Sequence, residues 1–197
     1  MASATSIPRF TPEQYLALER KADFKSEFCN GFIIAMAGAS REHNVIAGNL
    51  HGEIRSQLKE RPCEVYISDM RVRVSPAGLF TYPDVVAVCG KARFLDDKGD
   101  TLLNPTMIAE VLSTSTESYD RGDKFMHYRR LESLREYVVV AQEKVLVERF
   151  TRQGDEWLLT EFRKLDETLR LASIDCAVPL REIYARIEFP AEDAAGT

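Results

Sequence analysis

Glu110 is the residue whose type and position carry the clearest chemical information in this sequence. It interrupts the apolar residues 107–109 and 111–112, and such a continuous apolar segment is typical of a strand buried on both faces. An ionised carboxylate buried in such a strand needs a cation, a set of hydrogen-bond donors or a shifted pKa. A structural salt bridge and a functional site both satisfy this need. We favour the site, because perturbed carboxylates concentrate at functional sites.

Asp84 repeats the pattern in front of the apolar residues 85–88. Pro83-Asp84 is also a common turn or cap dipeptide, so alone this residue favours the structural explanation. If the two strands are neighbours with Asp84 and Glu110 at matching heights, their carboxylates converge at the distance that a divalent cation requires. Oxygen ligands of this kind suit Mg²⁺, which keeps several waters and binds through one or two carboxylates. The sequence therefore predicts a Mg²⁺ site, with Mn²⁺ as a substitute.

Lys124 is the third residue of this candidate site. It lies on a predicted helix over residues 119–132, one turn after Asp120 and one turn before Tyr128, so all three share a face. An ordinary helical ion pair between Asp120 and Lys124 is one interpretation. The other places the ammonium group beside a water bound to the metal. The spacing alone favours the ion pair.

The elements that must position these residues begin with a short helix and a hairpin. Thr11, Pro12 and Gln14 are typical of a helix start with a capping box, and they predict a helix to about Lys21. Residues 24–29 and 32–36 then flank Asn30-Gly31, the dipeptide preferred in a type I′ turn. The sequence thus predicts a hairpin that carries Glu27.

A longer helix and a series of strands follow. Apolar residues recur every four positions from 46 to 58, until Pro62, which predicts an amphipathic helix that begins near Ser40 and carries His43 in its first turn. Strands are predicted over 64–67, 70–74, 82–89, 107–112, 137–141, 145–150 and 157–162. Residues 75–78 are typical of a reverse turn, and 179–187 of a terminal helix. The helix over 119–132 lies between two apolar strands, which indicates a βαβ crossover at the sheet centre.

The composition favours one soluble domain. The chain has 197 residues with 45% hydrophobic and 29% charged residues, and no apolar run approaches the roughly 20 residues that span a bilayer. We expect a single domain over 11–189, a flexible N-terminus over 1–10, a flexible tail over 190–197 and a cytoplasmic location. The four cysteines form no metal-binding pattern and are expected to be reduced.

The net charge of -5 argues against a protein that coats nucleic acid by charge alone. Any nucleic acid must therefore meet a local basic surface. The candidates for it are Arg71, Arg73, Lys91, Arg93, Arg121, Lys124, Arg129 and Arg130.

Several motifs in this order resemble a known family. They are F-K-S-E-F-C-N-G-F over 24–32, H-N-V-I over 43–46, Y-P-D-V over 82–85, E-V-L-S-T-S-T over 110–116, and Y-D-R-G-D-K-F over 119–125 followed by Tyr128. From about residue 11 to residue 150 the chain resembles the Uma-type restriction endonuclease family of the PD-(D/E)XK nuclease superfamily. The resemblance implies an α/β (α+β) fold, in which helices flank a mixed central sheet, after an N-terminal helix and hairpin.

The resemblance also implies roles for individual residues. Asp84 and Glu110 bind Mg²⁺ with the Val111 carbonyl, Glu27 adds a ligand or orients a water, and Lys124 helps the attacking water and stabilises phosphoryl charge. The superfamily lysine commonly stands where this chain has Leu112, whereas the Uma-type pattern takes it from the following helix. Thr114 stands where proline is frequent, a change expected to affect loop stiffness. His43 either contacts phosphate or is a structural histidine.

The expected function is hydrolysis of DNA phosphodiester bonds by a homodimer, since a two-fold pair of sites serves the cutting of two strands. Two alternatives stay open because a fold does not establish an activity. One is a binding or assembly protein with this fold and no turnover. The other is a metal-dependent hydrolase of a small phosphoester, which predicts a closed pocket rather than an open cleft bordered by basic residues.

Overall fold

The computed structural model of the chain describes residues 9–76, 78–113 and 116–189. The flexibility expected for residues 1–8 and 190–197, the conformation of Ala77 in the predicted turn and the effect of Thr114 lie outside these ranges. Within them, no helix combines the length and the apolar character needed to cross a membrane.

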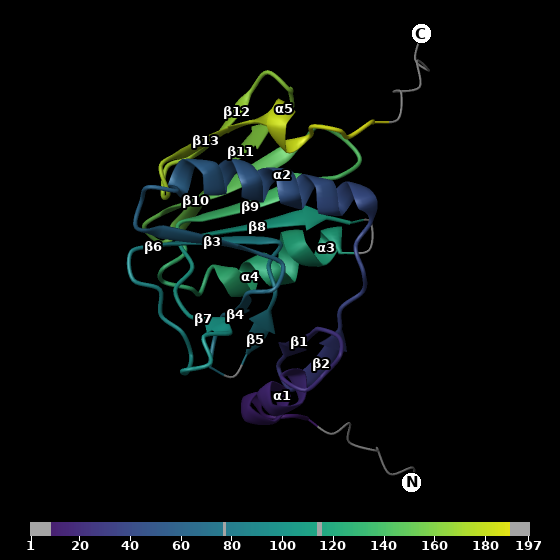
Figure 1. The fold of residues 1–197 in the computed structure, drawn as a ribbon, viewed down its shortest axis with the longest axis vertical. Coiled ribbons are helices and arrows are strands. Elements are labelled where there is room, and N and C mark those ends of the chain that lie inside the picture. The colour runs from purple at the N-terminus through teal and green to yellow at the C-terminus, as the bar shows by residue number, and fades with distance from the viewer. Residues whose placement is uncertain (1–8, 77, 114–115, 190–197) are drawn as a thin grey trace.

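A six-stranded mixed sheet forms the centre of the fold (Figure 1). Its strand order is β11-β10-β9-β8-β6-β3, and β8 and β9 are parallel whereas the other neighbours are antiparallel. The strands are β3 (Cys63–Ile67), β6 (Val85–Cys89), β8 (Met107–Leu112), β9 (Glu136–Ala141), β10 (Val147–Gln153) and β11 (Glu156–Phe162). The predicted strand over 107–112 is confirmed at both ends, and five of the other six predicted strands overlap these elements.

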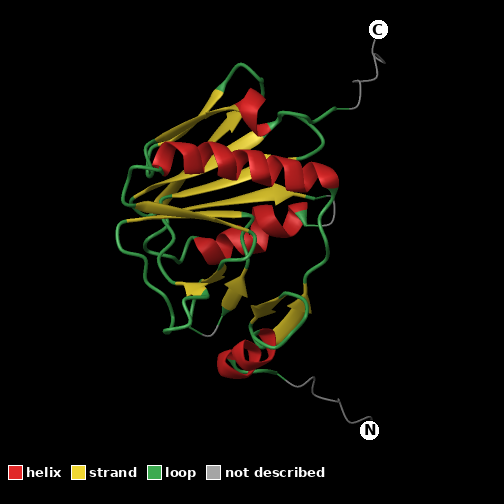
Figure 2. Ribbon diagram, in the orientation of Figure 1, coloured by secondary structure: helices red, strands yellow, loops and turns green. Residues whose placement is uncertain are grey.

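Helices cover both faces of this sheet (Figure 2). On one face lies α2 (Arg41–Leu58), whose buried Ile46, Leu50 and Ile54 pack against Val85 and Ala109. The opposite face is covered by a continuous helical stretch made of α3 (Glu117–Tyr119), the π-helical segment η1 (Asp120–Lys124) and α4 (Phe125–Tyr128). This stretch connects the adjacent parallel strands β8 and β9, so the predicted βαβ crossover is confirmed.

A second, smaller sheet has the order β2-β1-β5-β4-β7. It consists of β1 (Ser26–Cys29), β2 (Phe32–Ala35), β4 (Arg71–Arg73), β5 (Leu79–Thr81) and β7 (Thr101–Leu102), next to α1 (Pro12–Glu19). The capping box at Thr11 is present, and positive φ angles of 49° at Asn30 and 94° at Gly31 confirm the predicted hairpin turn. The strand predicted over 70–74 forms β4 and lies in this second sheet rather than in the central one, because it pairs with β5 and β7.

The two sheets share a hydrophobic core. Val72 and Leu79 of the small sheet belong to the same buried cluster as Val86 and Ile108 of the central sheet. The small sheet therefore packs against the face that also receives the helical stretch, and β1 comes close enough to contribute side chains to the same region.

The C-terminal region differs from the helix predicted over 179–187. The chain first forms the hairpin of β12 (Thr168–Leu171) and β13 (Cys176–Pro179), and then the short helix α5 (Leu180–Ile183). Leu169, Leu171 and Val178 are buried in the core under α2. Apolar residues alternate at 169, 171, 176 and 178, a pattern typical of strands that was not used in the prediction of this region.

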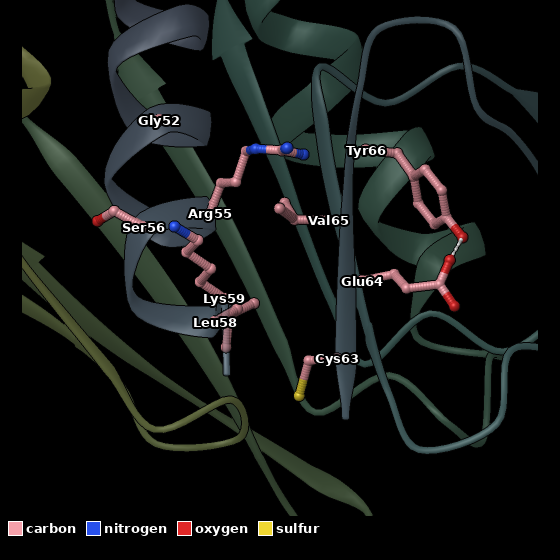
Figure 3. A pocket seen from close by; sticks show the side chains of 9 residues that line it. All are labelled: Gly52, Arg55, Ser56, Leu58, Lys59, Cys63, Glu64, Val65 and Tyr66. Carbon is pink, nitrogen blue, oxygen red and sulfur yellow. Dashed lines mark hydrogen bonds between the residues drawn. The ribbon is translucent and has the colours of Figure 1, made fainter. Parts of the chain in front are cut away.

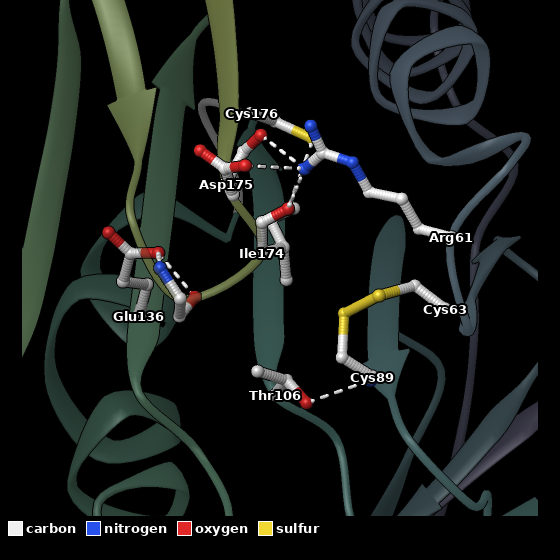
Figure 4. The surroundings of a disulfide bond; sticks show 9 residues. Arg61, Cys63, Cys89, Thr106, Glu136, Ile174, Asp175 and Cys176 are labelled. Atoms are coloured by element: carbon white, nitrogen blue, oxygen red, sulfur yellow. Dashed lines mark hydrogen bonds and ion pairs between the residues drawn. A yellow bond between two sulfur atoms is a disulfide. The ribbon is translucent and has the colours of Figure 1, made fainter.

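The prediction of four reduced cysteines is wrong for two of them. Cys63 and Cys89 form a disulfide (Figure 4), and Cys29 and Cys176 are free. The disulfide joins directly opposed residues of the antiparallel strands β3 and β6, whose Cα atoms are 4.0 Å apart. This proximity depends on strand register, so the spacing of cysteines along the sequence did not reveal it.

Asp100, in the loop before β7, forms ion pairs with two arginines. Arg20 follows α1 and Arg71 lies on β4, so the ion pairs connect these elements. The Asp100 carboxylate is 2.7 Å from Arg20 Nε and 3.0 Å from the buried Arg71 Nη2, and the hydrogen bonds from Arg20 hold the pKa of Asp100 well below its usual range. A carboxyl with a lowered folded-state pKa contributes stability above its unfolded pKa of about 3.9, and this contribution is lost as the pH falls further.

Asp100→Asn is therefore expected to lower the free energy of unfolding by about 1–3 kcal/mol at pH 7, since Arg71 keeps its charge in a buried position. The difference from wild type should narrow once the pH falls below about 4. Urea denaturation at pH 7 and pH 3 measures both values. Asp69→Asn is the control, because the Asp69 side chain is 86% exposed. Equal effects of the two substitutions would contradict the structural role of Asp100.

Candidate metal and catalytic site

Asp84 and Glu110 lie opposite each other at one end of the central sheet. Val85 pairs with Ala109 in the antiparallel register of β6 and β8, so the next pair outward is Asp84 and Glu110. Alternate residues of a strand point to the same face of the sheet. Asp84 therefore shares a face with Val86, and Glu110 with Ile108, and this is the face that the helical stretch covers. The structure therefore meets the condition that the metal-site hypothesis placed on these two carboxylates.

Glu110 is 3% exposed. Its Oε1 accepts a hydrogen bond of 2.7 Å from the Tyr128 hydroxyl and lies 2.9 Å from Lys124 Nζ. Burial raises the pKa of Glu110 to about 8, against the opposing effect of the Lys124 ammonium, and the nearby Asp84 adds to the increase. This carboxylate thus keeps its proton more readily than a surface glutamate, and a cation beside it would favour the ionised form.

Asp84 is held in place by donors to one of its oxygens. Oδ2 accepts a hydrogen bond of 2.7 Å from the Val111 backbone N–H and lies 3.1 Å from His43 Nε2. Among the described residues, all hydrogen bonds to the two carboxylates go to Oδ2 of Asp84 and Oε1 of Glu110. The second oxygen of each carboxylate is thereby left for a ligand.

Lys124 comes from the π-helical segment and is buried. Besides Glu110, its Nζ lies 3.3 Å from Asp120 Oδ1 and 3.4 Å from Glu27 Oε1. Burial opposes the charge on Lys124, but Glu110 and the other acidic groups outweigh it and raise the pKa of Lys124 well above its usual value. The lysine is therefore a permanent cation that three carboxylates share.

The helical stretch differs from the regular helix predicted over 119–132. It begins at Glu117, contains the π-helical segment and ends at Tyr128. Within the segment Asp120 and Lys124 are both buried. Lys124 forms the ion pair with Asp120 and also contacts Glu110. The spacing along the sequence had favoured only the ion pair. Such π-helical turns are rare and are found frequently at functional sites.

Glu27 reaches the cluster from the small sheet. Its position on β1 was predicted, and its carboxylate also accepts a hydrogen bond from the buried hydroxyl of Thr81 on β5. Thr81 was not predicted as a site residue, because residues 79–81 were not recognised as a strand. The site is thus assembled from both sheets and from the helical stretch between β8 and β9.

His43 is the residue with two competing interpretations. Its ring contacts Asp84 and the backbone of Val111; burial opposes its charge, but the hydrogen bond with Asp84 outweighs this and raises the pKa of His43. Asp84 is therefore the structural partner of His43. A contact between His43 and a substrate phosphate stays a prediction. In the absence of metal, the imidazole and the Val111 N–H hold Asp84 in position.

Four carboxylates form an acidic cluster, those of Glu27, Asp84, Glu110 and Asp120. The Lys124 ammonium contacts three of them, and Asp84 is bound by His43 instead. The excess of negative charge creates a demand for a further cation. Within residues 9–76, 78–113 and 116–189, no group of three or more His, Cys, Asp or Glu side chains has the arrangement of a complete metal site. The candidate ligands are therefore the two carboxylates of Asp84 and Glu110 and the Val111 carbonyl. This small set suits Mg²⁺, which retains several waters.

Three of the predicted basic candidates pair with acidic side chains inside the protein, and Lys124 is one of them. Arg71 is buried beside Asp100, and Arg121 pairs with Glu117 at 2.9 Å and with Glu148. Neither arginine is available as a free cation for nucleic acid, because each is paired with an acidic side chain. Of the other predicted candidates, Lys91, Arg93, Arg129 and Arg130 are exposed, and Arg73 is half-buried.

A hollow of about 700 Å³ lies elsewhere, between α2 and the edge strand β3 (Figure 3). Arg55 and Lys59 of the helix and Glu64 and Tyr66 of the strand line it. No residue of the acidic cluster lines this hollow. It is therefore not the closed pocket that a small-phosphoester hydrolase would place over the predicted site.

The chain matches known proteins over most of its length. The Uma2 family model, described as "Putative restriction endonuclease", matches residues 12–179. Two proteins of Synechocystis sp. (strain ATCC 27184 / PCC 6803 / Kazusa), both described as uncharacterized, are similar. The protein sll1609 is 40% identical over 152 residues, or 77% of this chain and 86% of the relative. The protein slr1290 is 33% identical over 185 residues, or 93% and 95%.

One solved structure shares the fold. It is the crystal structure of a putative nuclease belonging to DUF820 from Anabaena variabilis ATCC 29413, with a TM-score of 0.72 and 16% sequence identity. The match covers 89% of this chain and 97% of that chain. The similarity confirms the expected restriction-endonuclease-like fold, with its mixed central sheet and flanking helices.

Proposed function

The chain belongs to the Uma2 family of putative restriction endonucleases, and on this premise we propose that it is a metal-dependent endonuclease that hydrolyses DNA phosphodiester bonds. The observation that carries the proposal is the position of Glu110. It is a buried carboxylate opposite Asp84 and 2.9 Å from the buried Lys124. A salt bridge alone would need one acidic partner for the lysine, whereas this lysine has three.

The residues present fit a Mg²⁺ ion. Asp84, Glu110 and the Val111 carbonyl would hold it, with Mn²⁺ as a substitute, because these are hard oxygen ligands in a region with excess negative charge. When bound, the ion supplies Lewis-acid stabilisation of the charge on the phosphate.

The remaining residues of the cluster act on the water and the phosphate. Lys124 donates to the developing negative charge on the phosphoryl oxygens and orients the attacking water. Glu27 orients the same water from the side of the small sheet. Asp120 holds Lys124 in position, Tyr128 holds Glu110, and His43 holds Asp84. Hydrogen-bond partners commonly orient metal ligands in this way.

DNA is the proposed substrate. The exposed basic candidates follow β6 and the helical stretch, at the end of the central sheet away from Asp84 and Glu110. Lys91, Arg93, Arg129 and Arg130 are exposed and can contact phosphates, which supply most of the non-specific affinity for DNA. A homodimer is proposed because two strands require two sites related by a two-fold axis.

Asp84→Asn tests the proposal. Wild type is expected to cleave duplex, single-stranded or branched DNA in Mg²⁺ or Mn²⁺. The variant should lose about a hundredfold or more in rate, because one anionic ligand is replaced by a neutral amide. Cleavage is followed on labelled oligonucleotides, with the exposed Asp97→Asn as the matched control.

Two results would redirect the proposal. Equal cleavage by wild type and Asp84→Asn would remove the proposed metal site. If wild type binds Mg²⁺ in a thermal-shift assay but cleaves no DNA, the binding or assembly alternative is favoured. Hydrolysis of a small phosphoester such as p-nitrophenyl phosphate in the absence of DNA cleavage would favour the second alternative.

A further inference from the structure

The hydrogen-bond donors of the acidic cluster are almost all committed to carboxylates. Tyr128 donates to Glu110, Thr81 to Glu27, and the Val111 N–H to Asp84. His43 also contacts Asp84, and the Lys124 ammonium is shared by Glu110, Asp120 and Glu27. A phosphate that enters this site needs donors, because its own oxygens are acceptors and the carboxylates repel it.

The hydroxyl of Tyr119 is the exception. It is buried and has no hydrogen-bond partner among the described residues. Its ring lies 6.0 Å from Lys124 Nζ, and its charged form would interact with Glu27, Lys124 and Asp120. The hydroxyl therefore lies within the electrostatic reach of Glu27 on β1 and of Lys124 and Asp120 on the helical stretch.

A buried hydroxyl without a partner is unfavourable, so it calls for an explanation. If Tyr119 served only to pack its ring, phenylalanine would fill the same place without this cost. Burial raises the pKa of Tyr119 further above its usual value, so the group keeps its proton at neutral pH. It is thus a neutral donor on a ring whose centroid lies 6.0 Å from the lysine ammonium.

We propose that the Tyr119 hydroxyl donates a hydrogen bond to a non-bridging oxygen of the substrate phosphate, next to Lys124. This role rests on the proposed nuclease function and adds a substrate-binding residue to it. The neutral donor and the ammonium group together bind two sides of the phosphate, while the carboxylates stay with the metal. Tyr119 immediately precedes the π-helical segment, so the same turn positions both donors.

Tyr119→Phe tests this role with a minimal change. The rate of DNA cleavage at saturating substrate is expected to fall about a hundredfold, as for loss of one donor to a charged transition state. The melting temperature of the metal-free protein should not fall, because the hydroxyl bonds to no described residue. Tyr184→Phe is the matched control with the opposite pattern, because its hydroxyl bonds Ala141 O and the Leu146 backbone. Its melting temperature should fall and its cleavage rate should persist.

A second measurement does not depend on turnover. In protein labelled with ¹³C at tyrosine Cζ, the signal absent from Tyr119→Phe identifies Tyr119. This signal is expected to shift when a phosphorothioate DNA duplex is added in Mg²⁺, with binding checked by fluorescence anisotropy. The proposal is overturned if Tyr119→Phe cleaves at the wild-type rate, or if the signal stays unchanged while the duplex is bound.

Failure of the nuclease function gives a different result. If wild type cleaves no DNA, the proposed nuclease activity is lost. The Tyr119 signal then decides whether the hydroxyl contacts a phosphate. A shift on duplex binding supports a hydroxyl that contacts phosphate, and an unchanged signal overturns it.

Discussion

Glu110→Gln is expected to abolish Mg²⁺-dependent cleavage while the protein stays folded. The cleavage rate should fall about a thousandfold or more, the equivalent of roughly 4 kcal/mol of transition-state stabilisation. Glutamine keeps the size of the side chain and an oxygen that can accept the Tyr128 hydroxyl, but it carries no charge to hold a cation. The loss should therefore come from the metal and not from the packing of β8.

A thermal-shift titration with Mg²⁺ separates these two effects. Because a ligand stabilises the folded state according to its concentration relative to Kd, Mg²⁺ should raise the melting temperature of wild type and leave that of Glu110→Gln unchanged. In EDTA the variant should melt near or above wild type, since it no longer buries a carboxylate. A Mg²⁺ response equal to that of wild type would contradict the role of Glu110 as a ligand.

Glu136→Gln is the matched control on the neighbouring strand. Glu136 is also a buried strand glutamate (Figure 4). Its carboxylate, however, accepts hydrogen bonds from the backbone N–H groups of Ala172 and Ser173. Its substitution should weaken the fold, because those bonds hold the turn between β12 and β13. Its response to Mg²⁺ and its cleavage rate per folded molecule should match wild type.

The contrast between Glu110 and Glu136 shows what the sequence could predict. Glu110 was conspicuous because five apolar residues of one strand surround it, and the same pattern fixed both ends of β8. Its pairing with Asp84 followed once the two strands were assumed to be neighbours. Local chemistry was sufficient here, because a continuous apolar run has few alternatives in a soluble protein.

The features that the sequence did not predict depend on contacts between distant segments. Cys63 meets Cys89 only through the register of β3 and β6, and Arg71 is withdrawn from the surface only because Asp100 and β7 lie beside β4. The assignment of β4 and β5 to a second sheet has the same origin. Strand propensity identifies a strand but does not choose its partner.

The π-helical segment is a further case. The spacing of Asp120, Lys124 and Tyr128 predicted one regular helix with an ordinary ion pair. The structure keeps these side chains on one buried face and adds contacts of Lys124 with Glu110 and Glu27. The family motif, rather than helical spacing, was the signal that assigned Lys124 to the site.

Lys124→Met is expected to lower both activity and stability. The buried Nζ lies within 3.4 Å of three carboxylates, and removal of one partner from a buried charged group typically costs about 3–5 kcal/mol. Urea denaturation in EDTA measures this loss, and DNA cleavage should be undetectable. Lys25→Met is the control, because Lys25 is 39% exposed beside Asp69 and such surface pairs contribute about 1 kcal/mol or less.

The double variant Lys124→Met/Glu110→Gln shows whether the cluster acts as one charge network. Removing both partners of a buried pair costs less than removing one, because no unpaired charge remains between them. The double variant should therefore be more stable than Lys124→Met, with an interaction energy of about 0.5–3 kcal/mol. Additive effects would mean that Lys124 and Glu110 are independent, and the lysine would then lose its place beside the proposed metal. Coupling would instead explain why the carboxylates of Glu27, Glu110 and Asp120 stay together in the metal-free protein, since Lys124 holds them until a cation binds.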